Sequence, residues 1–411
     1  MNNTHAALAA TAAATAVAAT YPFVGLGPQV KNLLDSAAAE AITITLGTAT
    51  LAGGSRIRVA GCEGARDASP TVELPSATGP AELDLYCDPV DGTLNAARGG
   101  PRAVSVVGFG RPGTATPLFD DQAIFAVGSH SQDVSAVFNY GADLFGLIAE
   151  HLHRPELMTA TLNREDNLGL LGELAGQYAA GRVIGSRSGY RPTIAGPGWS
   201  AVGDTTIPLP FECDLEFGRI GLVEAQIQSA LYPSWSGLVV SRDRIRTHPG
   251  GLRGYLQDYL HARTRTDRAT LRSLFTAREL ARFDRQQMPI EDLTAPLRPD
   301  RFGAGAEAVI AIAAVTGLHD PVTGHPADVL HAPVWHSGPG RLEVDTLTTS
   351  GGAITRRAVT ITPADTPGLQ PQARAWYRTL HWSDVPGAED LSACAEGRNP
   401  NAHNLIEARQ R

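Results

Sequence analysis

The chain has 411 residues, of which 43% are hydrophobic and 18% are charged, and its formal net charge is −8 at pH 7. This composition is typical of a water-soluble globular protein, with enough chain for one large core or for two fused halves. The mild acidity argues against nucleic acid as a partner, because nucleic-acid binding favours a concentrated basic face. It leaves an anionic substrate open, since a bound metal ion can supply local positive charge.

The first twenty residues are rich in alanine and threonine. A secretory signal peptide needs a basic start and a strongly apolar core, whereas the first lysine of this chain is Lys31. We therefore predict a helix over residues 4–19, which alanine propensity favours. No stretch is long and apolar enough to span a bilayer, so we expect no membrane partner and a cytoplasmic protein.

The four cysteines are scattered and form no CxxC pair, which argues against a structural zinc site. Reduced cytosolic thiols fit this pattern best. Cys62 and Cys87 each directly precede a candidate metal-binding acid. A redox role for this pair stays open beside the simpler interpretation of buried free thiols.

Helical and strand-like patterns alternate through the first half of the chain. They predict helices over residues 35–42 and 94–97, strands over 56–60, 81–87, 103–108 and 123–127 with the last two as neighbours, and a mostly helical spacing over 134–152.

The second half opens with a predicted strand over 159–162 and a helix over 168–180, before a long Gly- and Pro-rich connection over 185–210. Loops of this length are often functional. The arginine-rich segment 242–287 favours a solvated helical face or an oligomer contact over phosphate binding. The remaining predictions are helices over 220–231, 252–262 and 268–286, and strands over 237–240, 308–315, 341–347 and 353–361. This mixture predicts an α/β (α+β) protein with layered sheets, in two joined halves over residues 1–155 and 156–411.

The most informative motif is the run Asp-Pro-Val-Asp-Gly-Thr, from Asp88 to Thr93. It follows an alternating stretch and precedes a small-residue segment, so we expect a strand that ends in a kinked acidic turn before a helix. Carboxylate oxygens at such a turn suit Mg²⁺, which shares its coordination with substrate phosphates. The alternative is an acidic turn whose Asp and Gly serve only the turn geometry.

Two further acidic positions lie upstream. Glu63 stands among small residues after the predicted strand 56–60, where its carboxylate could reach the same metal ion. Earlier still, a segment with proline and glycine leads to Lys31 and Asp35. Taken singly, the two acids could be ordinary surface residues, the lysine a solvated one and Thr93 a helix cap.

These three segments, in this order, resemble the class II fructose-1,6-bisphosphatases, a branch of the lithium-sensitive, metal-dependent sugar-phosphate and inositol-phosphate phosphatases. The likeness continues through residues 99–106 and returns in the closing strands, at 315–317, 342–347 and 356–357. The resemblance implies an αβαβα sandwich of the sugar/inositol phosphatase type, and hydrolysis of a phosphate monoester by water that bound Mg²⁺ or Mn²⁺ activates. We also expect a homodimer or homotetramer.

The resemblance implies a role for each matching position. Metal-site acids match at Asp35, Glu63, Asp88 and Asp91, with Glu224 as the nearest match to a late glutamate ligand. Thr93 matches the hydroxyl that orients the attacking water, paired with Asp35, and the catalytic residues are then Asp35, Glu63 and Thr93. Substrate contacts are implied for Lys31, Gly92, Thr93 and Arg164.

The chemistry of phosphate esters supports this assignment independently. Two divalent ions can neutralise the phosphate, activate a water and stabilise the leaving alkoxide. Four or five carboxylates are about what two or three Mg²⁺ ions need beside water and phosphate ligands. Gly92 and Thr93, if they open a helix, offer backbone N–H groups to the phosphate. We expect the metal-free protein to be inactive.

The substrate region departs from the family pattern. Class II bisphosphatases usually place a tyrosine and a basic residue where this chain has residues 119–124, and more often carry glutamate at the position of Asp91. Their Asp-Gly-Asp loop is not evident in residues 185–204, where Arg187 and Arg191 occur instead. We therefore expect a different phosphorylated sugar, cyclitol or nucleoside-like substrate. The two arginines either grip its phosphate or carboxylate or lie in an ordinary exposed loop.

Two other functions stay open. A phosphatase-like protein could bind a phosphorylated ligand or a partner chain without turnover. The metal site could also perform another reaction on a sugar phosphate, such as elimination or isomerisation.

Overall fold

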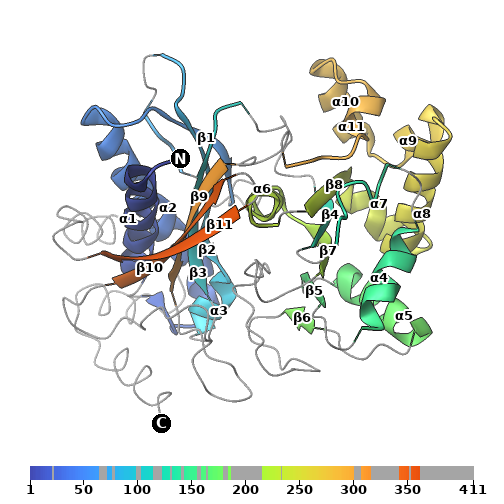
Figure 1. Cartoon of the computed structure of the whole chain (residues 1–411), viewed down its shortest axis with the longest axis horizontal. Helices are drawn as coiled ribbons and strands as arrows, with labels where there is room; N and C mark the ends of the chain where they lie inside the picture. Colours follow the sequence, from blue (N-terminus) through green and yellow to red (C-terminus); the bar gives the residue numbers. More distant parts are fainter. Residues whose placement is uncertain are drawn as a thin grey trace, which may run out of the picture.

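Two β-sheets with helices against both of them make up the described part of the protein (Figure 1). The computed structural model describes residues 1–20, 23–63, 72–75, 79–98, 103–113, 123–129, 132–139, 143–154, 159–162, 165–178, 184–186, 215–232, 234–299, 307–315, 342–350 and 353–361. The protein is mixed α/β, as the sequence predicts.

The helices form layers around the sheets (Figure 1). The first sheet is covered by α1 (Asn3–Thr20) and α2 (Lys31–Leu51), while α6 (Leu222–Leu231) contacts strands of both sheets and lies between them. The other helices are η2 (Pro28–Val30), α3 (Thr93–Arg98), α4 (Leu144–Leu152), α5 (Glu165–Tyr178), α7 (Arg242–Thr247), α8 (Gly251–Thr264), α9 (Arg268–Ser273), α10 (Ala277–Arg285) and α11 (Ile290–Leu293).

The alanine-rich N-terminus is a helix, as predicted, and it lies in the core. Its alanines from Ala9 to Ala16 are almost completely buried between α2 and the first sheet. Small side chains allow the two helices to approach closely, and the hydroxyls of Thr15 and Thr45 are only 3.0 Å apart across that contact. High helix propensity and small volume therefore act together in α1.

The first sheet combines strands from the two ends of the chain. Its order is β1 (Ile57–Cys62), β2 (Leu83–Asp91), β3 (Val104–Gly110), β9 (Glu307–Ala314), β10 (Leu342–Ser350) and β11 (Ala353–Ile361). Only the pair of β1 and β2 is parallel among these neighbours. The predicted pairing of strands 103–108 and 123–127 is wrong, because β3 pairs with β9 instead.

The acidic run is part of a strand. We expected the strand to end before Asp88, but β2 continues to Asp91 and pairs with β3 on both sides of a register shift. Pro89 has no N–H to donate to a ladder, and an irregularity at this point accommodates it. The helix that was predicted after the run is present as α3.

The second sheet contains β4, the strand that was predicted to lie beside β3. Its order is β6 (Ile184–Ser186), β5 (Thr159–Leu162), β7 (Leu215–Ile220), β4 (Ala123–Ser129) and β8 (Ser234–Val240). β4 runs antiparallel to β7 and β8, while β5 runs parallel to β6 and β7. The carboxyl ends of β5, β6, β7 and β8 therefore lie along the same edge of this sheet.

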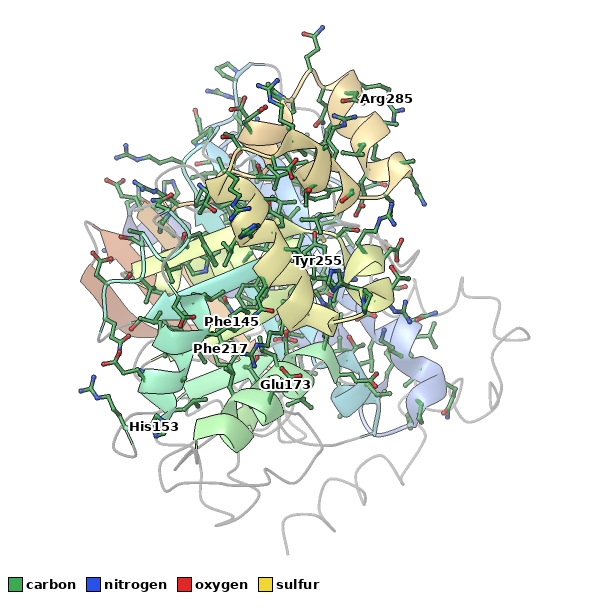
Figure 2. All side chains as sticks on the ribbon, turned by 90° about the vertical axis from the view of Figure 1, so that its right-hand side faces the viewer. Phe145, His153, Glu173, Phe217, Tyr255 and Arg285 are labelled. Atoms are coloured by element: carbon green, nitrogen blue, oxygen red, sulfur yellow. The ribbon has the colours of Figure 1, made fainter. Side chains whose placement is uncertain are left out.

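The outer helices of the second sheet pack through aromatic side chains. Tyr255, Tyr259, Phe275 and Phe283 form a series of ring contacts with centroids 6.1–6.3 Å apart. Figure 2 looks onto these helices, with Tyr255 near their centre and Arg285 at the outer end of α10.

Two helix predictions in this region need correction. The predicted helix 268–286 is two helices, α9 and α10, because Thr276 and Glu279 form a capping box that starts a new helix. The helical spacing over 134–152 yields a helix only in α4. No described helix combines the length and the apolar character that crossing a membrane requires.

Candidate functional site

Glu63 and Asp88 lie side by side at the ends of two parallel strands. The register pairs Cys62 with Cys87, so the residue after each occupies the same level of the sheet. The Glu63 backbone N–H donates to the Cys87 carbonyl oxygen at 3.0 Å, which fixes this arrangement one step beyond the last pair. The predicted proximity of these two acids is thus present in the backbone.

β2 carries Asp88 and Asp91 on one face. Leu85, Cys87 and Val90 pack into the core with α1 and α2, so the alternation of a strand turns Asp88 to the opposite face. Residues three apart in a regular strand face opposite sides. The register shift between Asp88 and Asp91 changes this, and Asp91 returns to the side of Asp88. Both aspartates are buried, with exposed fractions of 4% and 2%.

Thr93 joins this strand end to helix α2. Its hydroxyl oxygen lies 2.8 Å from Asp35 Oδ1 and 2.8 Å from the Val90 carbonyl oxygen, two acceptors that compete for its single proton. Gly92 precedes it with a φ of 82°, which favours glycine. The pairing of Thr93 with Asp35 that the resemblance implies is therefore present as a hydrogen bond.

Lys31 and Asp35 share one face at the start of α2, because they are four residues apart. The turn before α2 is tied to α3 by backbone hydrogen bonds from Gly25 to Ala96 and from Gly27 to Ala97, at 2.9 and 2.7 Å. These contacts hold the start of α2 against the helix that Thr93 opens.

Helix α6 faces the same region from the other side of the first sheet. Glu224 lies in its first turn, although the structure does not describe that side chain. Gln226 is completely buried beside Gly61, and neither of its amide atoms has a hydrogen-bond partner among the described residues. No sequence pattern singles out Gln226, since a glutamine on an amphipathic helix usually faces solvent.

The candidate metal ligands are of the chemical type that a hard divalent cation prefers. All of them are carboxylates, and Glu63 Oε2 is shielded from water without a hydrogen-bond partner among the described residues. Within the described ranges, however, no three His, Cys, Asp or Glu side chains come together closely enough to hold a metal ion.

The two thiols beside the acids are buried and free. A hydrogen bond with Cys62, together with burial, raises the pKa of the Cys87 thiol well above its ordinary value. Cys87 therefore stays protonated at neutral pH, and a protonated thiol is a poor nucleophile.

The N-terminal part of the chain also matches a known protein family. Residues 2–153 match the family model of bacterial fructose-1,6-bisphosphatase, glpX-encoded. The match supports a fructose-1,6-bisphosphatase-like protein and thereby a sugar-phosphate phosphatase. No curated protein matches the chain. The match covers less than half of the chain.

The extent of the match divides the predicted site. It contains seven of the candidate positions, namely Lys31, Asp35, Glu63, Asp88, Asp91, Gly92 and Thr93. It ends before the four later candidates, Arg164, Arg187, Arg191 and Glu224. The three arginines among them also lie outside the described residues.

Proposed function

We propose that the protein is a metal-dependent phosphatase that hydrolyses a phosphate monoester of a sugar or sugar-like metabolite. One observation carries this proposal: within the segment that is similar to bacterial fructose-1,6-bisphosphatase, Thr93 Oγ1 lies 2.8 Å from Asp35 Oδ1, next to the strand end of Asp88 and Asp91. A hydroxyl held by a carboxylate beside other carboxylates is an arrangement that can orient and deprotonate a water.

The proposed cation is Mg²⁺ or Mn²⁺, held by Asp35, Glu63, Asp88 and Asp91 with Glu224 as a further ligand. When bound, it supplies positive charge that neutralises the phosphate and lowers the pKa of a water.

The remaining steps belong to side chains of the chain itself. Thr93 donates its proton to Asp35 Oδ1, which leaves the lone pairs of its oxygen to accept a hydrogen bond from the attacking water. Asp35 Oδ1 is then the atom that receives a proton passed through Thr93. Gly92 has no side chain, so a phosphate can approach the backbone there, and the Lys31 ammonium adds positive charge to that end of α2.

The substrate is proposed to be a phosphorylated sugar, cyclitol or nucleoside-like compound other than simply fructose 1,6-bisphosphate. The altered residues 119–124 and 185–204 support this choice. We further propose an αβαβα sandwich of the sugar/inositol phosphatase type with halves at 1–155 and 156–411. In this proposal Arg164, Arg187 and Arg191 contact the substrate, and the protein is a cytoplasmic homodimer or homotetramer.

A panel assay tests the proposed activity. Release of inorganic phosphate is measured from phosphorylated sugars, cyclitols and nucleosides, first with excess EDTA and then with added Mg²⁺ or Mn²⁺. We expect release only with the metal and from a substrate other than fructose 1,6-bisphosphate. A strong preference for fructose 1,6-bisphosphate would contradict the proposed change of substrate but would still support the phosphatase activity.

A phosphatase-like protein that binds a phosphorylated ligand without turnover is the second candidate. The observation that favours it is that, in the part of the chain described, no three metal-binding side chains come together. Binding without release of phosphate from any compound of the panel would support it. Phosphorus NMR of the products would separate hydrolysis from elimination or isomerisation.

A further inference from the structure

The carboxyl edge of the second sheet brings arginines together. Arg219 lies near the end of β7, and Arg242 directly follows β8 and its cap Ser241. Both strands run antiparallel to β4, so their ends reach the same edge. Arg246 stands one turn further along α7, on the same face as Arg242.

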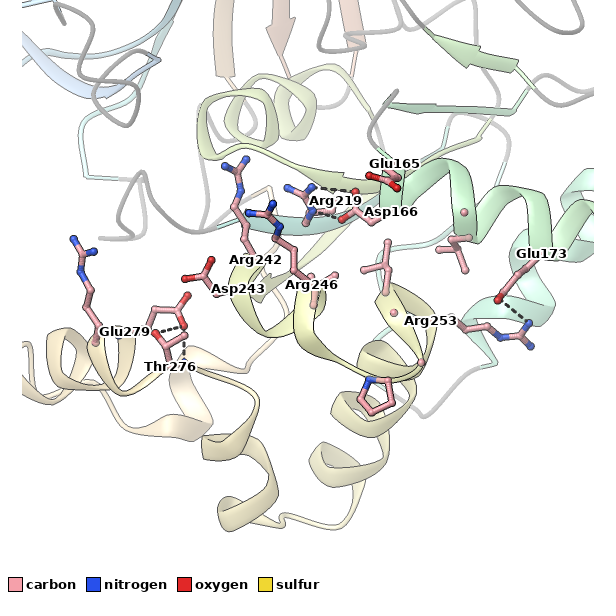
Figure 3. A pocket seen from close by; sticks show the side chains of 18 residues that line it. Glu165, Asp166, Glu173, Arg219, Arg242, Asp243, Arg246, Arg253, Thr276 and Glu279 are labelled. Carbon is pink, nitrogen blue, oxygen red and sulfur yellow. Dashed lines mark hydrogen bonds and ion pairs between the residues drawn. The ribbon is translucent and has the colours of Figure 1, made fainter.

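A pocket of about 1,060 Å³ opens at this edge. It is lined by the start of α5, the end of β7 and parts of α7, α8 and α10 (Figure 3). Small-molecule sites commonly have volumes of roughly 300–1,000 Å³. None of the proposed metal-site acids lines the pocket, so it is distinct from the site at the end of β2.

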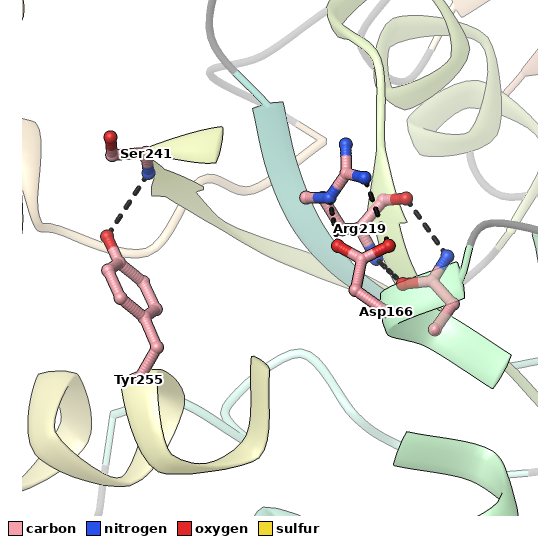
Figure 4. A network of polar contacts seen from close by, with 5 residues as sticks. Asp166, Arg219, Ser241 and Tyr255 are labelled. Carbon is pink, nitrogen blue, oxygen red and sulfur yellow. Dashed lines mark hydrogen bonds and ion pairs between the residues drawn. The ribbon is translucent and has the colours of Figure 1, made fainter. Parts of the chain in front are cut away.

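The walls of the pocket are held by paired groups. The guanidinium of Arg219 is bound by both carboxylate oxygens of Asp166 (Figure 4). The Ser241 N–H donates to Tyr255 Oη at 3.1 Å, and that hydroxyl donates to the Leu274 carbonyl oxygen at 3.0 Å. The start of α7, which carries Arg242, is thus anchored to the aromatic core.

Arginines and acids are equally numerous in the lining of this pocket, but only some of them form ion pairs with each other. Five arginines and five acids line it. Asp166 binds Arg219, Glu173 lies 3.5 Å from Arg253, and Glu279 accepts hydrogen bonds from Thr276 in the capping box. Three arginines have no ion pair among the described residues, namely Arg242, Arg246 and Arg278, and the lining acids outside these two ion pairs are Glu165, Asp243 and Glu279.

Arg242 offers hydrogen-bond donors that suit an anion. Its Nε and Nη2 atoms are shielded from water, and neither has a hydrogen-bond acceptor among the described residues. Buried donors of a charged group are costly to leave unsatisfied. Figure 3 shows the Arg242 and Arg246 side chains extending in the same direction from α7, toward Arg219.

We propose that this pocket binds the phosphate group of a small phosphorylated metabolite between Arg242 and Arg246. Guanidinium groups suit this ligand because they offer parallel N–H donors to an oxyanion. Glu165 and Asp243, which also line the pocket, can accept hydrogen bonds from hydroxyls of the rest of the ligand. The site needs no metal, and it does not depend on the proposed phosphatase activity.

Calorimetric titration with inorganic phosphate, in the presence of EDTA, tests this site. We expect one binding event that Arg242→Gln and Arg246→Gln each weaken by at least about tenfold, as for loss of a charge-assisted contact. Arg285→Gln removes the same charge from an exposed position outside the pocket and should bind as the wild type does. Asp88→Asn should also leave this binding unchanged.

Several outcomes of this titration would contradict the proposed phosphate site. No binding by the wild type, or binding that both arginine variants retain, would overturn the proposal, as would binding that only Asp88→Asn removes. Because Arg246 is exposed, its variant stays informative even if Arg242→Gln does not fold. Binding of citrate but not phosphate, lost in the same variants, would replace a phosphate by a carboxylate ligand and overturn the proposed ligand class.

Discussion

The two sheets carry opposite charges at the ends of their strands. In the first sheet, Glu63 and Asp88 stand where β1 and β2 run side by side. In the second, Arg219 and Arg242 stand at the ends of β7 and β8. Carboxylates suit a cation that acts on phosphate, whereas guanidinium groups suit phosphate itself.

The two edges also differ in their likeness to known proteins. The acids lie within the segment that matches bacterial fructose-1,6-bisphosphatase, and these arginines lie beyond it. We infer that the first edge accounts for the class of reaction and the second for a ligand particular to this chain.

The largest effect is expected at Asp35. Asp35→Asn should lower kcat by about 10²–10⁴-fold, the usual range for loss of a general base, because an amide cannot take the proton passed on by Thr93. The measurement is turnover of the compound that the panel selects. Glu40→Gln, an exposed change on the same helix, is the matched control and should keep wild-type activity. Equal activity in both variants would remove Asp35 from the mechanism.

Alanine substitutions at two glycines distinguish the effect of a backbone constraint on stability from the effect of helix propensity. Gly92→Ala should lower the free energy of unfolding by about 1–2 kcal/mol, because its φ of 82° disfavours a side chain. Gly172→Ala in α5 should raise it by about 0.5–1 kcal/mol, since an added methyl group there meets open space. Urea unfolding of both variants measures the pair. A stabilising Gly92→Ala would show that the connection between β2 and α3 tolerates another conformation.

Helix α6, between the sheets, offers a smaller test. Gln226→Leu should raise the free energy of unfolding by about 1 kcal/mol, because it removes two buried amide atoms that have no hydrogen-bond partner among the described residues. Leucine has a similar size, so the packing against β1 should survive. A destabilised variant would show instead that the amide is hydrogen-bonded in solution, and a loss of activity at unchanged stability would give Gln226 a role beside Glu63.

The smallest effect concerns a buried acid of the second sheet. Burial raises the pKa of Glu216 well above its ordinary value of 4.5, although hydrogen bonds from Tyr232 and Gln228 oppose that rise. The contribution of this carboxyl to stability is therefore complete below pH 4.5 and is lost as pH rises through the raised pKa. Relative to the wild type, Glu216→Gln should become more stable as pH increases. Thermal unfolding of both proteins across this pH range measures the difference in stability. A difference that stays constant with pH would contradict the raised pKa of Glu216.

Local sequence patterns predicted the elements better than their pairing. The helix at the N-terminus, the strand 159–162 and the closing strands appear where expected. The pairing of β3 with β9 was not predicted. β9 is about two hundred residues away in the chain, and register between distant strands leaves no local periodicity. The break between α9 and α10 could have been found, since Thr276 and Glu279 have the spacing of a capping box.

The candidate site was predictable only in part. Adjacent parallel strands bring Glu63 beside Asp88, and Thr93 contacts Asp35. The pocket at the second sheet was not foreseen, because an arginine-rich helical segment is usually a solvated face. What distinguishes Arg242 is that its Nε and Nη2 atoms are shielded from water without an acceptor among the described residues, and only packing in three dimensions reveals that.

The central claim is that carboxylates at the end of β2 support metal-dependent phosphate release. The most direct test follows inorganic phosphate while Mg²⁺ is titrated into EDTA-treated wild type, Asp88→Asn and the control Glu40→Gln. The account predicts release that rises with Mg²⁺ in the wild type and in Glu40→Gln, and none in Asp88→Asn. Release that needs no metal, or that Asp88→Asn retains in full, would contradict it.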